Sequence, residues 1–141
     1  MKNKVTLFIK SRQEYSADDN ELIEYNTEGI LYKKREKLYL LYKNKELAEA
    51  NSRIKVDPLM QEVSIYRDKP QLRQQFIEKE SFSSKYYASY GVFDMDIYTD
   101  YLSISLGDKN GSIKIVYQIY LNKKYLSKNN LDISWEILKR K

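Results

Sequence analysis

The chain has 141 residues, a formal net charge of +5 at pH 7, and neither Cys nor His. The lack of Cys excludes disulfides, thiolate catalysis and Cys-based metal sites, and it is typical of a cytoplasmic protein. The lack of His excludes imidazole acid–base chemistry, Ser-His triads and most transition-metal sites. With no Gly-rich phosphate loop either, we expect no enzyme, no cofactor and no metal centre.

The length fits one domain over residues 1–141. No apolar run reaches the ~18 residues of a transmembrane helix, so we expect no membrane partner. Lys10 and Arg12 interrupt the short apolar run near the N-terminus, and no small-residue cleavage site follows. We therefore expect no signal peptide there.

Apolar and polar residues alternate with a period of two along most of the chain, which predicts strands with one face on a core. The first half shows this pattern over 5–14, 23–27, 30–33, 38–42, 52–56, 63–65 and 72–76. Turns are predicted over 16–20, 33–36 and 68–71, where polar residues or Pro interrupt the pattern. The segment 43–50 favours a helix, a loop or a strand continuation about equally.

The second half predicts strands over 82–90, 93–97, 102–106, 112–121 and 131–137. The phase of the alternation shifts by one before Leu102, which indicates a bulge or bend near Asp100. The G-D-K-N-G sequence at 107–111 predicts a hairpin turn, and the polar segment 123–130 predicts another turn.

Nine or ten strands joined by short polar turns predict an all-β protein. Nearly all connections have hairpin length, so neighbouring strands in sequence should pair. A meander of this size curls, and closure removes its exposed edges. We therefore expect a closed antiparallel up-and-down barrel of about eight to ten strands in preference to a sandwich.

The order of these strand residues resembles a known family. The segments L-Y-L-L-Y, V-S-I-Y-R, Y-Y-A-S-Y-G-V-F-D-M-D-I-Y-T, G-S-I-K-I-V-Y-Q-I and I-S-W are similar to those of the YwiB-like bacterial proteins. That resemblance implies a small calycin-type, lipocalin-like β-barrel with no assigned reaction. The chain lacks the early G-x-W of lipocalins, because its only Trp is Trp135. Lipid binding would therefore rest on the fold alone.

The first functional hypothesis is a binding module that holds a small apolar ligand in the barrel interior. Tyrosine is abundant, with 14 in the chain, and aromatic rings with polar handles suit ligand pockets. The predicted lining residues are Tyr86, Tyr90, Phe93, Met95, Tyr117 and Trp135. Gln74, Ser84 and Thr99 are polar members of the same inward faces and could orient a ligand or satisfy their neighbours.

The alternative is an interaction protein that acts on RNA or a protein partner through its basic surface and its C-terminal tail, Lys139, Arg140 and Lys141. Outward tyrosines (Tyr87, Tyr98 and Tyr120) interleaved with lysines could stack single-stranded bases. A third hypothesis places a catalytic carboxylate pair at Asp94 and Asp96. A simpler explanation is that both carboxylates lie on a solvent-exposed outer face of the barrel.

Overall fold

The computed structural model describes residues 2–16, 18–44, 50–68 and 71–138 of the chain. Ten strands form one antiparallel sheet within these residues. Their bounds are β1 Lys2–Ser16, β2 Asp19–Lys34, β3 Lys37–Asn44, β4 Ala50–Asp57, β5 Glu62–Asp68, β6 Gln71–Ile77, β7 Ser81–Ala88, β8 Gly91–Leu106, β9 Asn110–Leu121 and β10 Lys124–Ile137. No helix in the described part of the chain is long and apolar enough to cross a membrane.

The sheet closes on itself through its first and last strands. The order is β6-β5-β4-β3-β2-β1-β10-β9-β8-β7, so β1 pairs with β10 over a long register from Val5↔Ile137 to Glu14↔Lys128. The two edge strands, β6 and β7, follow each other in the chain but do not share a ladder among the described residues. The prediction of an all-β, up-and-down barrel is confirmed, with a nearly closed barrel whose seam lies between β6 and β7.

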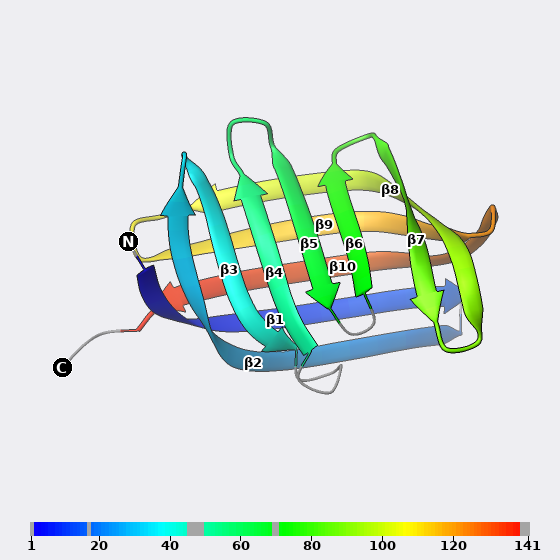
Figure 1. Ribbon diagram of the computed structural model, residues 1–141, viewed down its shortest axis with the longest axis horizontal. Coiled ribbons are helices and arrows are strands. Elements are labelled where there is room, and N and C mark those ends of the chain that lie inside the picture. Colours follow the sequence, from blue (N-terminus) through cyan, green and yellow to red (C-terminus); the bar gives the residue numbers. More distant parts are fainter. Residues whose placement is uncertain (1, 17, 45–49, 69–70, 139–141) are drawn as a thin grey trace.

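The barrel is flattened into two layers that cross at a steep angle (Figure 1). Strands β3 to β6 lie over β1, β10, β9 and β8, and the long strands β2 and β8 curve from one layer toward the other. Gly29 lies in β2 between Val5 of β1 and Tyr42 of β3, where β2 begins to pair with both neighbouring strands. A Cβ there would lie 2.5 Å from Leu7 Cδ1 and 2.7 Å from the Leu41 carbonyl oxygen. Only Gly permits so close an approach of backbone and side chain.

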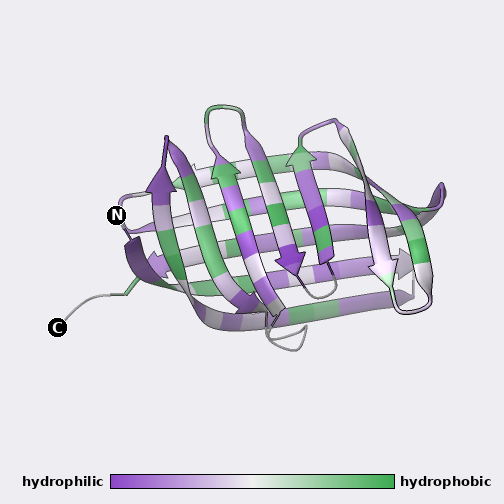
Figure 2. Cartoon of the chain, viewed as in Figure 1, coloured by the Kyte–Doolittle hydropathy of each residue, from purple (hydrophilic) through white to green (hydrophobic). Residues whose placement is uncertain are grey.

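The period-two pattern becomes the inside and outside of the barrel (Figure 2). Hydrophobic and hydrophilic residues alternate along the strands, and the inward members form one core. Its largest fully buried side chains are Trp135, Phe76, Leu7, Leu40, Ile54, Ile97, Ile113, Ile115, Ile133, Val5, Val56 and Val63. Burial of this apolar surface is the main stabilising contribution to the fold.

The structure confirms two local predictions, a register shift in β8 and a hairpin turn after β2, and leaves a third untested. The pairing register of β8 with β9 shifts between Thr99 and Tyr101, as the phase shift had indicated. The predicted hairpin at 33–36 is present, with Arg35 and Glu36 both at positive φ, as a two-residue type I′ hairpin turn requires. The segment 43–50 falls largely outside the described residues; Lys43 belongs to the end of β3 and Ala50 begins β4.

One predicted turn is wrong. Only Asn122 and Lys123 separate β9 from β10, and the rest of the polar segment 123–130 is strand. The inward positions of this part of β10 are Ser127 and Asn129, which are buried although they are polar. The apolar signal of a strand is therefore missing from a segment that is paired on both sides.

Candidate ligand cavity

The barrel interior changes character from one end to the other. We call the end where β1 finishes and β10 begins the polar end, and the opposite end the packed end. Inward positions change from apolar to polar toward the polar end. The chain runs in that direction along β1 and β5 and in the opposite direction along β4 and β10. The series are Val5, Leu7, Ile9, Ser11, Gln13, Tyr15; Val56, Ile54, Ser52; Val63, Ile65, Arg67; and Trp135, Ile133, Leu131, Asn129, Ser127.

A cavity of about 510 Å³ lies at the polar end. This volume is in the range of ~300–1,000 Å³ that is common for small-molecule sites. Its lining combines aliphatic side chains with hydroxyl, amide and guanidinium groups. The lining residues are Ile9, Ser11, Gln13, Tyr15, Tyr25, Tyr42, Ser52, Ile65, Arg67, Leu72, Gln74, Tyr86, Tyr90, Met95, Tyr117, Ile119, Leu121, Leu126, Ser127, Leu131 and Ile133.

Several polar atoms in this half of the barrel are buried without a hydrogen-bond partner among the described residues. They are Ser52 Oγ, Ser84 Oγ, Thr99 Oγ1 and Asn129 Oδ1. Asn129 is fully buried and donates through Nδ2 to Ser127 Oγ at 3.1 Å. An unsatisfied buried polar group costs about 1–3 kcal/mol. Of these four residues, Ser52 lines the cavity, where a bound molecule or water could satisfy its hydroxyl.

Tyr117 is one of the lining residues and is only 6% exposed. Its ring contacts that of Phe76, with 4.8 Å between centroids. Burial raises the pKa of the Tyr117 phenol from 10.0 to about 12; the positive charge of Arg67 acts against this rise and Tyr15 adds to it. The phenol is therefore neutral at physiological pH and can donate a hydrogen bond.

Four of the six residues predicted to line the interior lie in this cavity: Tyr86, Tyr90, Met95 and Tyr117. Tyr90 is 79% exposed, so it lies at the rim. Phe93 is half-buried on the same face of β8 as Met95, and its ring contacts that of Tyr90 with 5.6 Å between centroids. Whether these residues hold a ligand stays a prediction.

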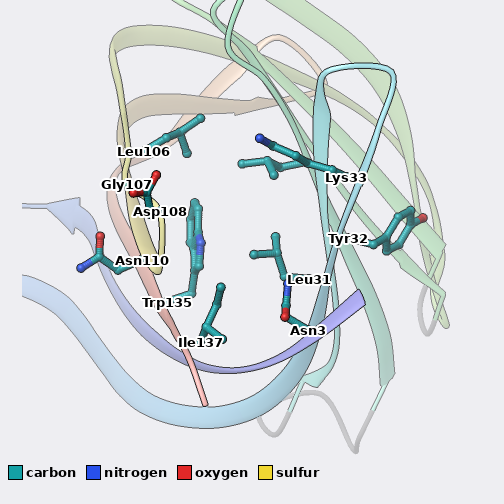
Figure 3. A pocket seen from close by; sticks show the side chains of 11 residues that line it. Asn3, Leu31, Tyr32, Lys33, Leu106, Gly107, Asp108, Asn110, Trp135 and Ile137 are labelled. Carbon is teal, nitrogen blue, oxygen red and sulfur yellow. The ribbon is translucent and has the colours of Figure 1, made fainter. Parts of the chain in front are cut away.

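Trp135 lies elsewhere, at the packed end, where it is 2% exposed. It lines a smaller cavity of about 260 Å³ together with residues of the β8–β9 hairpin and of β2. Figure 3 shows the indole ring standing between Leu106 and Asp108 on one side and Leu31 on the other, while the Tyr32 ring points away. Trp135 therefore does not share a cavity with the four tyrosine and methionine side chains, because it comes from the opposite end of the β10 inward series.

The sequence prediction missed the most polar part of the lining. Arg67 follows Val63 and Ile65 in phase, and Gln13 and Tyr15 continue the inward series of β1. The period-two alternation could have identified these residues, because a residue two or four positions after a buried one lies on the same face of the strand. Gln74, which the sequence did single out, lines the cavity from β6.

The carboxylate pair lies on the outer surface. Asp94 pairs with Lys85, and Asp96 accepts a hydrogen bond from Ser83 Oγ. The hydrogen bond from Lys85 lowers the pKa of Asp94. The Lys85 and Asp94 side chains are exposed, and Asp96 is half-buried. No group of three or more His, Cys, Asp and Glu residues that could hold a metal ion occurs in the described part of the chain.

The residues of the nucleic-acid alternative are only partly described. Lys139, Arg140 and Lys141 lie outside the described residues. Of the tyrosines expected to face outward, Tyr87 is exposed, whereas Tyr98 and Tyr120 are half-buried. The Tyr120 hydroxyl donates to Gln118 Oε1 at 2.9 Å, and its ring makes an edge contact with Tyr125. Tyr120 is therefore already engaged by its neighbours on the outer face.

Comparison with known proteins identifies the family. The family described as "Domain of unknown function (DUF1934)" matches residues 8–133. The chain is 28% identical over 134 residues to the uncharacterized β-barrel protein YwiB of Bacillus subtilis (strain 168), covering 94% of this chain and 92% of that protein. The crystal structure of the ywiB protein from Bacillus subtilis is similar with a TM-score of 0.83 at 27% identity, covering 98% of this chain and 94% of that one. The chain thus belongs to the DUF1934 family and shares the β-barrel fold of YwiB.

Proposed function

We propose that the protein binds a small, largely apolar molecule in the cavity at the polar end of the barrel. The observation that carries this proposal is the combination of open volume with buried, unpartnered polar atoms in the same half of the interior. A barrel interior evolved only for stability gains from close packing of apolar side chains. Here the same sheet buries mainly apolar side chains around a cavity of about 260 Å³ at one end and leaves a larger cavity of about 510 Å³ at the more polar end.

The lining suits a ligand with an apolar body. Ile9, Ile65, Leu72, Met95 and Ile119 provide aliphatic surface. Burying a ligand against them contributes about 25 cal/mol for each Å² removed from water. The tyrosine hydroxyls and the Ser52 hydroxyl supply directional hydrogen bonds that fix its orientation.

Access to the cavity is available at the rim. Tyr90 is largely exposed in the β7–β8 turn, and Leu126 is partly exposed on β10. Gln74 and Tyr86 line the cavity from the two edge strands, β6 and β7. The seam between these strands has no ladder to break, so it is the part of the wall that separates at least cost.

The test uses a neutral apolar fluorophore, 1-aminoanthracene, titrated into purified protein. Binding is expected to raise its emission with saturation, and native mass spectrometry should show a one-to-one complex. A Gln74→Trp variant fills the cavity from β6 and should weaken binding at least about tenfold. The matched control is Arg73→Trp, because Arg73 is the exposed neighbour on the outer face of the same strand.

Thermal unfolding of both variants checks that they fold. Equal binding by Gln74→Trp and Arg73→Trp would place the fluorophore on the surface and refute the proposal. Absence of any saturable binding by the unmodified protein, together with no thermal shift across a panel of lipids and metabolites, would also refute it.

A further inference from the structure

The cavity lining carries one kind of charge. Among the described residues that line it, Arg67 is the one ionised side chain, and no Asp or Glu contributes to the wall. The smaller cavity at the packed end differs, because both Lys33 and Asp108 line it. The described lining of the larger cavity therefore carries a positive charge, and low-dielectric walls strengthen the effect of such a charge on a ligand.

Arg67 is placed where a ligand head group would meet several donors. It lies on β5 opposite Ser52 of β4 and Leu72 of β6. Ser52 is 4% exposed, and its Oγ is buried without a hydrogen-bond partner among the described residues. The Arg67 charge also acts on the Tyr117 phenol of β9, so its influence reaches the opposite layer of the barrel. Arg67 itself interacts with other residues of the protein.

We propose that the ligand is an amphiphilic monoanion, with a carboxylate that binds Arg67 and Ser52 and an aliphatic or aromatic body that fills the rest of the cavity. This inference rests on the proposed binding function and adds the ligand class. A guanidinium presents parallel N–H donors that match the two oxygens of a carboxylate. A carboxylate brings a single negative charge to the one cation of the described lining, whereas a phosphate monoester would bring about two at neutral pH.

The test compares three decyl compounds that share the same chain: decanoate, decanol and decyltrimethylammonium. Affinities are measured by displacement of 1-aminoanthracene and by calorimetry at pH 7.5, below the micelle-forming concentration of each compound. Decanoate is expected to bind at least about tenfold more tightly than decanol, since a charge-assisted hydrogen bond pair contributes that much. Decyltrimethylammonium should bind most weakly.

The Arg67→Gln variant should lose the preference for decanoate over decanol while it keeps its affinity for decanol. Arg67→Lys should retain part of the preference, because the charge remains and the paired donors do not. The matched control is Arg53→Gln. Arg53 lies on the outer face of the neighbouring strand β4, 5.5 Å from the centre of the Tyr66 ring, and its removal should leave the preference unchanged.

Two results separate this inference from the proposed function. Equal affinity for decanoate and decanol, or an unchanged preference in Arg67→Gln, would overturn the ligand class and leave apolar binding standing. Failure of all three compounds and of the fluorophore to bind would overturn both. Tightest binding of decyltrimethylammonium would contradict the positive cavity directly.

Discussion

The two ends of the barrel are built by the same strands but differ in the side chains that they bury. At the packed end, β10 contributes Trp135 and Ile133, both almost fully buried. At the polar end the same strand contributes Asn129 and Ser127, also buried but polar. A residue that is costly to bury is retained when it has a use beyond stability. Under the proposed function, the packed end contributes most of the stability and the polar end recognises the ligand.

The largest expected effect is on stability at the packed end. Trp135→Ala removes a fully buried indole and should lower the free energy of unfolding by about 3–5 kcal/mol. Urea unfolding followed by circular dichroism measures the change. Tyr87→Ala is the matched control, because Tyr87 is an exposed aromatic residue on β7. Similar midpoints for the two variants would show that the packed end is not the main source of stability.

The second effect concerns pH at the polar end. The Tyr117 pKa rises from 10.0 in the unfolded chain to about 12 in the fold. The folded state holds this proton more tightly, so stability is complete below pH 10 and falls as pH rises toward 12. The loss attributable to Tyr117 is about 2–3 kcal/mol. Unfolding midpoints measured from pH 8 upward should decline less in Tyr117→Phe, and parallel declines in both proteins would contradict the assignment.

The third effect tests how tightly the packed end is filled. Gly111 lies opposite Trp135 in the β9–β10 pairing, and a Cβ there would lie 2.3 Å from Trp135 Cζ2. Gly111→Ala should therefore cost about 1–3 kcal/mol through overpacking. In a Trp135→Leu background the cost should shrink, because the clashing ring is gone. An equal cost in both backgrounds would assign the effect to backbone conformation instead.

The smallest effect has the opposite sign and belongs to the polar end. Ser52→Ala removes a buried hydroxyl without a partner among the described residues. The free energy of unfolding should stay equal or rise by up to about 1 kcal/mol, while affinity for decanoate should fall. Calorimetric binding and urea unfolding on the same preparation test both parts. A clear loss of stability would mean that the hydroxyl already has a structural role.

The sequence predicted the packed end well because alternation of apolar residues defines both strand and face. Val5, Leu7, Ile113 and Ile115 are buried as their phase indicates. The polar end was harder to predict, because its inward residues are polar and do not show the alternation of apolar residues. Ser127 and Asn129 are inward residues that look like turn residues, and Arg67 looks like a surface residue until the register of β5 is known.

The position of the open seam in the barrel was the second feature that the sequence could not predict. Periodicity predicts strands that curl, but it does not specify which edges remain. The seam lies between β6 and β7 because β1 and β10 pair along most of their length. That pairing joins the two ends of the chain, a contact of maximal sequence separation that no local pattern encodes.

The most direct test is a crystal structure of the protein with 10-bromodecanoate, in which the anomalous signal of bromine locates the chain and the density locates the head group. We predict the carboxylate within hydrogen-bonding distance of Arg67 and Ser52, with the bromine among the aliphatic side chains of the larger cavity. Bromine bound on the outer surface, or in the cavity beside Trp135, would contradict the proposal that the ligand binds at the polar end of the barrel and not at the packed end.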